Sequence, residues 1–323
     1  MELVAINCPL CGSAKNKEIF RTKDWLAEDD STSFRVVKCL DCSLRFVNPR
    51  PADLDIPSLY PRTYFSTDID LELLLDQQKN INREKAKIVE TDRLSGRILD
   101  IGCQKGEFLE YMHRRGWEAF GVELSLEVPN FFGLPIHRGK LVDAAYPDNF
   151  FDVVTYWAVI EHIPDIIAHV EETRRILKPG GSIIMLTTNY ISFSTGVLKL
   201  DDIPRHLVLF TKKTLAKLLE NHGFHVEKSF CSNRISRISA YGLLQYLTNR
   251  LLNKASEDFY REHFRILFSP RKDLQGRLAR LRAMSLSKLA LVSTDRLVGA
   301  LLDRLSLLLG FYGIIIVKAR KKD

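Results

Sequence analysis

Four of the six cysteines in the 323-residue chain form two close pairs. Cys8 and Cys11 make one Cys-x-x-Cys knuckle, and Cys39 and Cys42 make a second. Two such knuckles supply four thiolates to a tetrahedral Zn²⁺, and the segment between them is long enough for a β-hairpin. Because no coordination position would stay open, we expect a structural Zn²⁺. An iron–sulfur centre and free thiols are the alternatives.

A second group of residues suits an adenosine-containing cofactor. The segment ILDIGCQKGEF, starting at residue 98, has the pattern of a strand, a glycine-bearing turn and a helix. Gly102 lets the backbone approach a ligand closely, and Gly106 allows a tight start to the helix. Glu123 follows the next expected strand, where a carboxylate can accept both hydroxyls of a ribose. The pattern does not by itself choose between a dinucleotide and S-adenosylmethionine, and a plain tight turn is the alternative.

Three residues are candidates for proton transfer. Glu161 and His162 lie in VIEHIPD, directly after an expected strand, and His206 lies in the loop IPRHLVLF. A carboxylate or an imidazole at such a place can act as a general base. For His162, a hydrogen bond to nearby backbone is an equal alternative. Asn189 is a further pocket candidate, whereas we expect Cys103 to pack as a small apolar residue.

The segments LDIGCQKG, GVELS, YPDNFFDVVTYWAVIEHIPD and RRILKPGGSIIMLTTN resemble the successive motifs of class I S-adenosylmethionine-dependent methyltransferases. The resemblance covers residues 8 to 230 and resumes at the final strand. It extends to the branch that carries an N-terminal zinc ribbon and is often met among surface-glycan and small-molecule modifying enzymes. It implies an α/β fold with a doubly wound seven-stranded Rossmann-like sheet, in the order 3-2-1-4-5-7-6 with the last strand antiparallel.

The same resemblance assigns roles to individual residues. Asp100, Gly102 and Gly106 would shape the pocket for the methionine end of the cofactor, and Glu123 would bind its ribose. The turn made by Gly139, Lys140 and Leu141 would lie near the adenine. Trp157 would cover the cofactor or the substrate entrance, with a plain core position as the alternative.

Two departures from the family pattern affect the cofactor pocket. Gln104 stands where a small residue or glycine is usual, and it would crowd the loop unless its side chain turns away. The stretch Ser125–Leu134 is shorter than the usual helix, and Pro129 interrupts it. The adenine side of the pocket is therefore expected to be built differently.

Alternating apolar runs and helical patterns position these residues in a parallel sheet. Helices are expected at Ile69–Ser95, Asp165–Leu177 and Lys212–His222, the second followed by a turn at Pro179-Gly180-Gly181. The expected strands are Arg97–Ile101, Trp117–Val122, Pro135–His137, Asp152–Tyr156, Ser182–Thr187, Phe224–Phe230 and Gly313–Ala319.

Five regions follow from these patterns. They are a zinc ribbon (1–50), a linker and cover helix (51–95), a methyltransferase core (96–230), a basic helical insertion (231–310), and the last core strand with a tail (311–323). Leucines recur at helical spacing in the insertion, with arginines between them. Two amphipathic helices packed on the domain, or a dimer interface, explain this pattern. A helix lying on an anionic membrane surface is the alternative.

Charge and cysteine usage bear on the compartment and the partners. The formal net charge is +7, and the basic excess falls between Cys231 and Gly310. The N-terminus lacks the pattern of a secretory signal, so we expect a cytoplasmic protein, at most peripheral to a membrane. The cysteine region lacks the interleaved aromatic and basic residues of a single-strand platform, which argues against nucleic acid as a partner.

The sequence thus predicts methyl transfer from S-adenosylmethionine, at oxygen, to a small-molecule, glycan or lipid-linked acceptor. Two alternatives stay open. One is an RNA or protein methyltransferase, whose affinity for nucleic acid would fall steeply with salt. The other is a non-catalytic module that retains the fold, which Gln104 and the shortened second helix would favour. The sequence leaves the oligomeric state open, and an oligomer is compatible with each of these functions.

Overall fold

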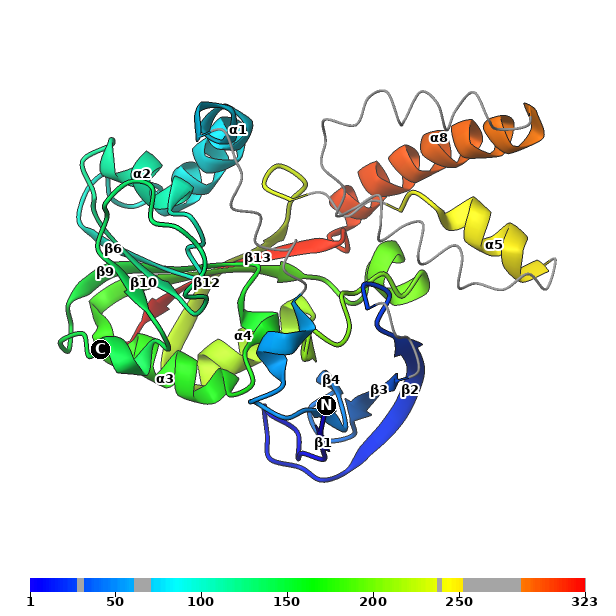
Figure 1. Ribbon diagram of the computed structural model, residues 1–323, viewed down its shortest axis with the longest axis horizontal. Coiled ribbons are helices and arrows are strands. Elements are labelled where there is room, and N and C mark those ends of the chain that lie inside the picture. The colour runs from blue at the N-terminus through cyan, green and yellow to red at the C-terminus, as the bar shows by residue number, and fades with distance from the viewer. Residues whose placement is uncertain (28–31, 61–70, 237–239, 252–285, 323) are drawn as a thin grey trace.

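The computed structural model describes all residues except 28–31, 61–70, 237–239, 252–285 and 323, together with the side chains of residues 71–74 and 286–289. Most of the leucine- and arginine-rich stretch expected to form the middle of the helical insertion therefore lies outside the described residues. Figure 1 shows a central sheet with helices above and below it, a small N-terminal lobe beneath one end, and two helices projecting at that end.

Seven strands form the central sheet in the order β12-β13-β10-β9-β6-β7-β8. All neighbours run parallel except β13, which is antiparallel to both β10 and β12. This is the expected doubly wound order. The strands are β6 (Arg97–Ile101), β7 (Glu118–Glu123), β8 (Ile136–Arg138), β9 (Phe151–Trp157), β10 (Leu177–Thr188), β12 (Phe224–Cys231) and β13 (Ile314–Lys321).

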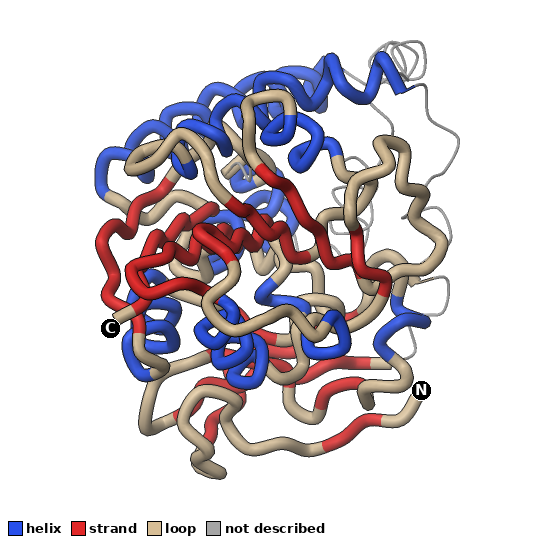
Figure 2. Tube along the Cα trace, turned by 90° about the vertical axis from the view of Figure 1, so that its left-hand side faces the viewer, coloured by secondary structure: helices blue, strands red, loops and turns tan. Residues whose placement is uncertain are grey.

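Helices cover both faces of this sheet because its central strands are apolar on both sides. On β6, Ile98 belongs to one buried cluster and Leu99 to the other. Helices α1 (Leu71–Val89) and α2 (Glu107–His113) lie over one face, and α3 (Ile166–Ile176) and α4 (Lys212–Asn221) over the opposite face (Figures 1 and 2). Asp165 caps α3 by accepting from the Ala168 amide, and Thr211 begins α4 with a capping box.

Two expectations about local structure had different outcomes. The Pro179-Gly180-Gly181 turn does not separate helix from strand, because β10 already begins at Leu177, which pairs with Phe151. The three residues form an irregularity within β10, where Gly180 has φ +66°. The absence of a full helix over Ser125–Leu134 is confirmed, since that stretch is turns and bends.

The cysteine region folds as a small β module beside the core. A β2–β3 hairpin (Asn16–Lys23 and Ser33–Cys39) fills the space between the two cysteine pairs, as expected. Its four-stranded sheet has the order β11-β4-β3-β2, with β4 at Arg45–Val47. Strand β11 (Val208–Leu209) comes from the loop that carries His206, so the module and that loop share one sheet. Strands β1 (Leu3–Val4) and β5 (Arg50–Pro51) form a separate antiparallel pair.

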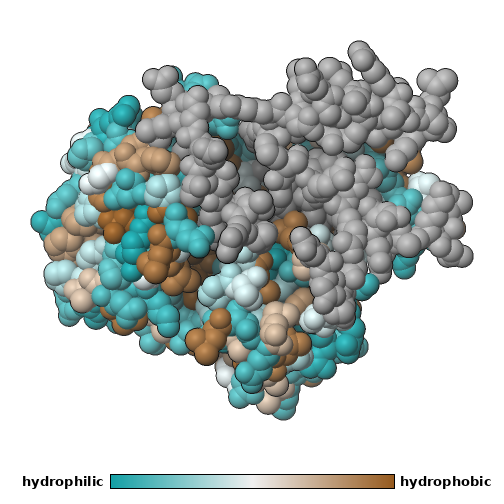
Figure 3. Space-filling model, viewed as in Figure 1, coloured by the Kyte–Doolittle hydropathy of each residue, from teal (hydrophilic) through white to brown (hydrophobic). Residues whose placement is uncertain are grey.

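The segment between β12 and β13 contains α5 (Leu243–Leu251) and α8 (Leu286–Leu309). Asp295 of α8 accepts hydrogen bonds from the Leu244 amide and from the Gln245 side chain, which joins the two helices. No helix in the described part of the chain is both long and apolar enough to span a bilayer. Hydrophilic and hydrophobic residues intermix over the coloured surface in Figure 3.

Four short helical turns complete the described elements: η1 (Ile56–Leu59), η3 (Val142–Ala144), η4 (Ile160–His162) and η5 (Phe193–Val197). Of these, η4 follows β9 directly and carries two of the candidate proton-transfer residues.

Candidate active site

The glycine turn after β6 lies at the carboxyl edge of the sheet. Gly102 has φ +69° and its amide donates to the Val122 carbonyl at 2.8 Å. A Cβ built on Gly102 would lie 2.6 Å from a Val159 methyl carbon, so only glycine fits there. Gly106, with φ +85°, is the N-cap of α2. The turn therefore places backbone without a side chain at Gly102, beside the point where strand order reverses, which is where such sheets bind ligands.

Glu123, at the end of β7, fixes the shape of this turn. Its two carboxylate oxygens accept hydrogen bonds from the Gln104 amide and the Ser125 amide, each at 2.9 Å. A carboxylate oxygen has a second lone pair, so both oxygens can still accept from ribose hydroxyls. Gln104 adopts φ +50° and its side chain is exposed, so only its backbone faces Glu123. The residue that could have crowded the loop turns outward.

The turn after β8 contains the three residues assigned to the adenine side. The Gly139 amide donates to the Glu123 carbonyl at 3.0 Å, which places this turn against the end of β7. Leu141 is buried in the core, whereas Lys140 is exposed. The turn is thus adjacent to Glu123, with its backbone rather than the Lys140 side chain held in place.

A lysine from α1 reaches the same sheet edge, and the sequence motifs gave no sign of it. The Lys85 ammonium lies 5.1 Å from the ring centre of Phe108 and 5.2 Å from that of Trp157. These two rings meet edge to face at 5.5 Å. Burial lowers the pKa of Lys85, while the carboxylates of Asp100 and Glu107 oppose that shift. Trp157 thus packs against Phe108 at the end of β9, with a cation near both rings.

Asp100 is almost fully buried, and its carboxylate interacts electrostatically with Lys85. Its carboxylate accepts from the Thr155 hydroxyl at 2.6 Å. Burial raises the pKa of Asp100 to about 7, although Lys85 and the Thr155 hydrogen bond act in the opposite direction. A cationic ligand group placed here would favour the ionised carboxylate, as the methionine end of the expected cofactor requires.

The three proton-transfer candidates come together, although His206 is more than forty residues from the other two. One nitrogen from each of His162 and His206 and one carboxylate oxygen of Glu161 all lie within 4.8 Å of one another. The two imidazole rings meet edge to face, with centres 4.7 Å apart. The sequence-based grouping of these residues at one sheet edge therefore agrees with their geometry.

Hydrogen bonds fix the tautomer of each histidine. Nδ1 of His162 lies 3.0 Å from the Arg205 carbonyl, which can only accept, so that nitrogen carries the proton. The Tyr60 hydroxyl lies 3.1 Å from the same nitrogen. Nδ1 of His206 lies 3.2 Å from the Asp201 carboxylate and donates to it. Both rings therefore keep the Nε2 lone pair for another partner.

Asp201 is the partner that the sequence did not reveal. It follows η5 and is buried, and its carboxylate also accepts from the Thr188 hydroxyl at 3.1 Å. Burial alone would lower the pKa of His206, but the hydrogen bond to Asp201 and the charges of Glu161 and Asp202 outweigh it and raise the pKa. Burial and the neighbouring His206 instead lower the pKa of His162 well below its usual value. One histidine is therefore a stronger base than the other.

Glu161 is fully buried, and within the described residues neither of its carboxylate oxygens has a hydrogen bond of good geometry. Burial raises its pKa, and the charge of His206 opposes that shift. Interactions with backbone and with the Thr187 hydroxyl also oppose the shift. A buried carboxylate without a well-formed hydrogen bond is costly, so this site is suited to a cation or a proton donor. Two imidazole nitrogens and one carboxylate oxygen could also hold a divalent metal ion.

Arg205 connects this cluster to the cysteine module. Its fully buried guanidinium makes ion pairs with Asp24 of the module at 2.6 Å and with Asp202 at 2.7 Å. It also donates to the Leu59 carbonyl at 2.8 Å. Because Arg205 precedes His206 and its carbonyl holds His162, the position of the two imidazoles depends on this buried network.

The four paired cysteines converge at one point of the module. The Sγ atoms of Cys8 and Cys42 are 3.4 Å apart, those of Cys11 and Cys39 are 3.6 Å apart, and all four lie within 4.8 Å of one another. Positive φ angles at Gly12 and Ser43 form the turn after each knuckle. Burial raises the pKa of Cys42 to about 11. Burial would also raise the pKa of Cys39, but hydrogen bonds from backbone and the Cys11 thiol outweigh it and lower that pKa to about 7. A bound cation would favour the thiolate at all four positions. The cluster is compatible with a zinc ribbon.

The two remaining sequence expectations concern residues near the site. Cys103 is buried against the core, and burial raises its pKa, in agreement with a packing role. The Asn189 side chain donates to the Tyr312 carbonyl at 2.9 Å and joins β10 to the start of β13. That bond holds the amide nitrogen in the framework of the sheet, while its buried oxygen has no partner among the described residues.

Comparison with known proteins identifies the domain that these elements form. Residues 74–229, from α1 to β12, match the family model described as a methyltransferase domain. This region belongs to the methyltransferase-domain family. The match contains the glycine turn, Glu123 and the Glu161–His162–His206 cluster, so these candidate residues lie inside a class I S-adenosylmethionine-dependent methyltransferase domain.

Several curated relatives of this methyltransferase domain are named ubiquinone biosynthesis O-methyltransferase. The protein of Alkalilimnicola ehrlichii is 37% identical over 105 residues, which is 29% of this chain and 42% of that protein. The protein of Idiomarina loihiensis is 38% identical over 112 residues, which is 31% of this chain and 45% of that protein. The chain thus spans about half the length of the curated relatives that it matches.

Among solved structures, an S-adenosylmethionine-dependent methyltransferase of Archaeoglobus fulgidus superposes with a TM-score of 0.46 and 18% identity. The superposition covers 78% of this chain and all of that one.

Proposed function

We propose that the chain transfers the methyl group of S-adenosylmethionine to a hydroxyl oxygen of a small-molecule, glycan or lipid-linked acceptor. The observation that carries this proposal is the Asp201–His206 hydrogen bond, next to Glu161 and His162 at the carboxyl edge of the methyltransferase sheet. A hydroxyl acceptor must lose its proton, and an imidazole held by a carboxylate suits that task. The O-methyltransferase names of the relatives point the same way.

The residues at the proposed cofactor end of the site would bind and orient S-adenosylmethionine. Glu123 would accept the ribose hydroxyls, and Asp100 would pair with the amino group of the methionine end. Bound S-adenosylmethionine supplies an electrophilic methyl group on its sulfonium. Displacement at that methyl depends chiefly on alignment of the acceptor oxygen, so the rigid glycine turn at Gly102 serves catalysis by fixing the position of the cofactor.

At the acceptor end, His206 would take the hydroxyl proton on Nε2 as the oxygen attacks. Asp201 holds the ring in the required tautomer and, with Glu161, stabilises the imidazolium that forms. His162 stays neutral because its pKa is lowered, so it would accept a hydrogen bond from the acceptor and orient it. Trp157 would cover the cofactor beside Lys85.

We further propose that Cys8, Cys11, Cys39 and Cys42 bind a structural Zn²⁺. The closely spaced sulfurs and the two knuckle turns support this, since four thiolates complete a tetrahedral site and leave no position for substrate. The metal would stabilise the small β module by joining its two knuckles.

The test is calorimetric titration with S-adenosylmethionine, followed by transfer of labelled methyl to glycan, lipid-linked and phenolic acceptors. We expect binding by the wild type and its loss in Glu123→Ala. In His206→Asn, binding should persist while transfer falls by about 10²–10⁴-fold. Absence of cofactor binding by the folded wild type would contradict the proposal and favour a non-catalytic module. Labelling of RNA or protein alone would favour a macromolecular acceptor.

A further inference from the structure

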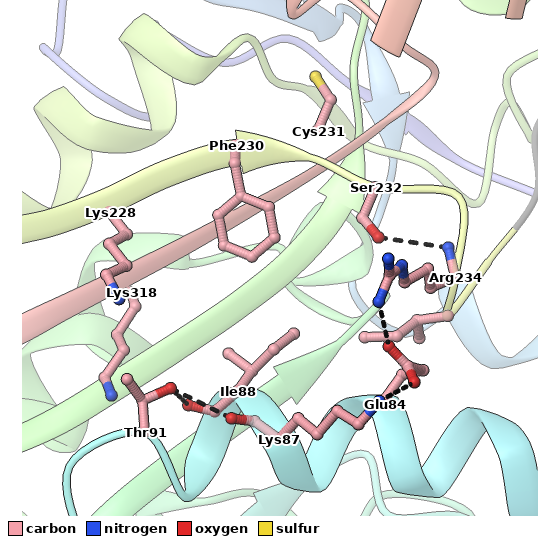
Figure 4. A pocket seen from close by; sticks show the side chains of 11 residues that line it. Glu84, Lys87, Ile88, Thr91, Lys228, Phe230, Cys231, Ser232, Arg234 and Lys318 are labelled. Carbon is pink, nitrogen blue, oxygen red and sulfur yellow. Dashed lines mark hydrogen bonds and ion pairs between the residues drawn. The ribbon is translucent and has the colours of Figure 1, made fainter. Parts of the chain in front are cut away.

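A pocket of about 340 Å³ lies away from the cluster of Glu161, His162 and His206, between the C-terminal half of α1, strand β12 and strand β13. Its size lies within the range of small-ligand sites. Its lining comes from three parts of the chain that are distant in sequence. The lining residues drawn in Figure 4 include Lys87 and Ile88 on α1, Lys228 and Phe230 on β12, and Lys318 on β13.

The charged side chains around this pocket are mostly basic. Lys87, Lys228, Arg234 and Lys318 line it, with Glu84 as the one acidic lining residue. Glu84 is shared, because it pairs with Lys87 at 2.6 Å and with Arg234 at 3.2 Å. The pocket therefore holds more positive charge than its own carboxylate can neutralise.

Lys228 of β12 and Lys318 of β13 contribute most to this excess of positive charge. Lys228 lies directly opposite Lys318 in the β12–β13 register, and like charges at facing positions destabilise a strand pair. Only 3% of the Lys318 side chain is exposed, and it pairs with Asp92 at 2.6 Å. Asp92 also forms an ion pair with Arg320, at 3.0 Å. In the described part of the chain, Lys228 has no carboxylate within 4 Å.

The centre of the pocket is apolar. Figure 4 shows the Phe230 ring between Lys228 and Lys318 on one side and Arg234 on the other, above Ile88 of α1. Ile235, which is buried, adds to the apolar lining. The Cys231 thiol points away and donates to the Gly310 carbonyl at 3.2 Å, so it does not contribute a polar group to the pocket.

We propose that this pocket binds an organic phosphate, with the phosphate between Lys228 and Lys318 and the organic group against Phe230. A phosphate monoester has a charge of roughly −1.5 to −2 at neutral pH and three acceptor oxygens, which matches two facing ammonium groups of which Asp92 neutralises one. The limited volume fits a single small group. The site is separate from the proposed methyl-transfer residues, so its test does not depend on methyltransferase activity.

The probes are phenyl phosphate and inorganic phosphate, titrated calorimetrically into the full-length protein. We expect phenyl phosphate to bind more tightly than inorganic phosphate, because only the former covers Phe230. Lys228→Gln should weaken phenyl phosphate binding by about 10-fold or more, as expected for loss of a charged hydrogen-bond donor. Lys213→Gln, an exposed lysine on α4, is the matched control and should leave binding unchanged.

Phe230→Ala separates the two parts of the site. It should reduce affinity for phenyl phosphate and leave inorganic phosphate binding unchanged, with thermal unfolding measured to show that the variant is folded. Phosphatidylcholine vesicles with and without phosphatidic acid then identify the source. Binding to phosphatidic acid that phenyl phosphate competes away indicates a lipid headgroup, and binding of phenyl phosphate alone indicates a soluble phosphate. Equal affinity of wild type and Lys228→Gln for phenyl phosphate, or no binding at all, would overturn the proposal.

Discussion

At the scale of single residues, the protonation of His206 governs the proposed reaction. Its pKa is raised above the usual 6.5 by Asp201 and the neighbouring carboxylates. The imidazolium cannot accept a proton, so the rate of methyl transfer should rise with pH and level off above this pKa. In Asp201→Asn the pKa should fall by about 1–3 units, and the acidic limb of the profile should move to lower pH by the same amount.

The plateau rate of Asp201→Asn should also fall, because the imidazolium formed during transfer loses its partner. The measurement is kcat against pH for both proteins. His162 provides the comparison. Its lowered pKa keeps it neutral over this pH range, so its titration should not appear in the pH profile of kcat. An unchanged profile in Asp201→Asn would show that another group takes the proton.

Lys85 supports a second residue-scale prediction. Its ammonium lies over Phe108 and Trp157 near Asp100, and we expect it to bind the carboxylate of the cofactor's methionine end. Lys85→Met should weaken binding of S-adenosylmethionine and S-adenosylhomocysteine by about 10–100-fold. Binding of 5′-methylthioadenosine, which lacks the amino-acid group, should not change. Calorimetry with the three ligands measures this difference.

Lys87→Met is the matched control, because Lys87 lies on the same helix but is exposed and paired with Glu84. It should not affect any of the three ligands. A loss of methylthioadenosine affinity in Lys85→Met would instead indicate that Lys85 supports the pocket as a whole.

The sequence predicted those candidate site residues that lie in local motifs. Gly102, Glu123, Glu161 and His162 each lie at or shortly after the end of a core strand, and the position of a strand end is a local property of the chain. Asp201 and Lys85 could not be found in this way. They belong to a loop and a helix whose distance from the site is set by tertiary packing, and no spacing in the sequence connects them to it.

At the scale of elements, the loop from η5 to β11 is held by the buried Arg205–Asp24 pair. Asp24→Ala would leave the guanidinium with Asp202 and the Leu59 carbonyl. Breaking a buried pair in this way costs about 3–5 kcal/mol, so the free energy of unfolding should fall by roughly 3 kcal/mol. Because the loop positions His162 and His206, kcat should fall more than cofactor affinity does.

Urea unfolding and cofactor titration measure both effects. Glu18→Ala, which breaks the exposed pair with Arg21 in the same module, is the control and should leave the urea midpoint unchanged. An Asp24→Ala variant as stable as the wild type would mean that Asp202 alone holds Arg205.

The sequence predicted the order of strands and helices along the chain better than it predicted the pairing between distant strands. The alternation of apolar runs and helices is enough to predict β6 to β10 and the helices around them. The pairing of β11 with β4 was not foreseen, because a two-residue strand has no periodicity of its own and depends on a distant edge strand. Similarly, Pro179 to Gly181 have the composition of a turn, and only the pairing of Leu177 with Phe151 places them within a strand.

At the scale of the whole molecule, the cysteine module and the methyltransferase core are coupled through two connections, the β4–β11 pairing and the Arg205–Asp24 pair. Loss of the proposed Zn²⁺ should therefore disturb the proposed acceptor end of the site and leave unchanged the proposed cofactor end, around Gly102, Asp100 and Glu123 of the core. Cys42→Ser should reduce the zinc content and abolish most methyl transfer, while S-adenosylmethionine affinity stays within about 3-fold, under 1 kcal/mol.

Cys231→Ser is the matched control, since this cysteine lies outside the cluster and its hydroxyl replacement can still donate to the Gly310 carbonyl. It should keep full zinc content and full transfer. Elemental analysis, cofactor titration and transfer assays on the two variants separate the connections. If Cys42→Ser lost cofactor binding together with transfer, the module would be required for folding of the core itself. If Cys42→Ser kept both cofactor binding and methyl transfer, the module would be an independent appendage. The buried Arg205 network would then not couple zinc binding to the position of the two histidines.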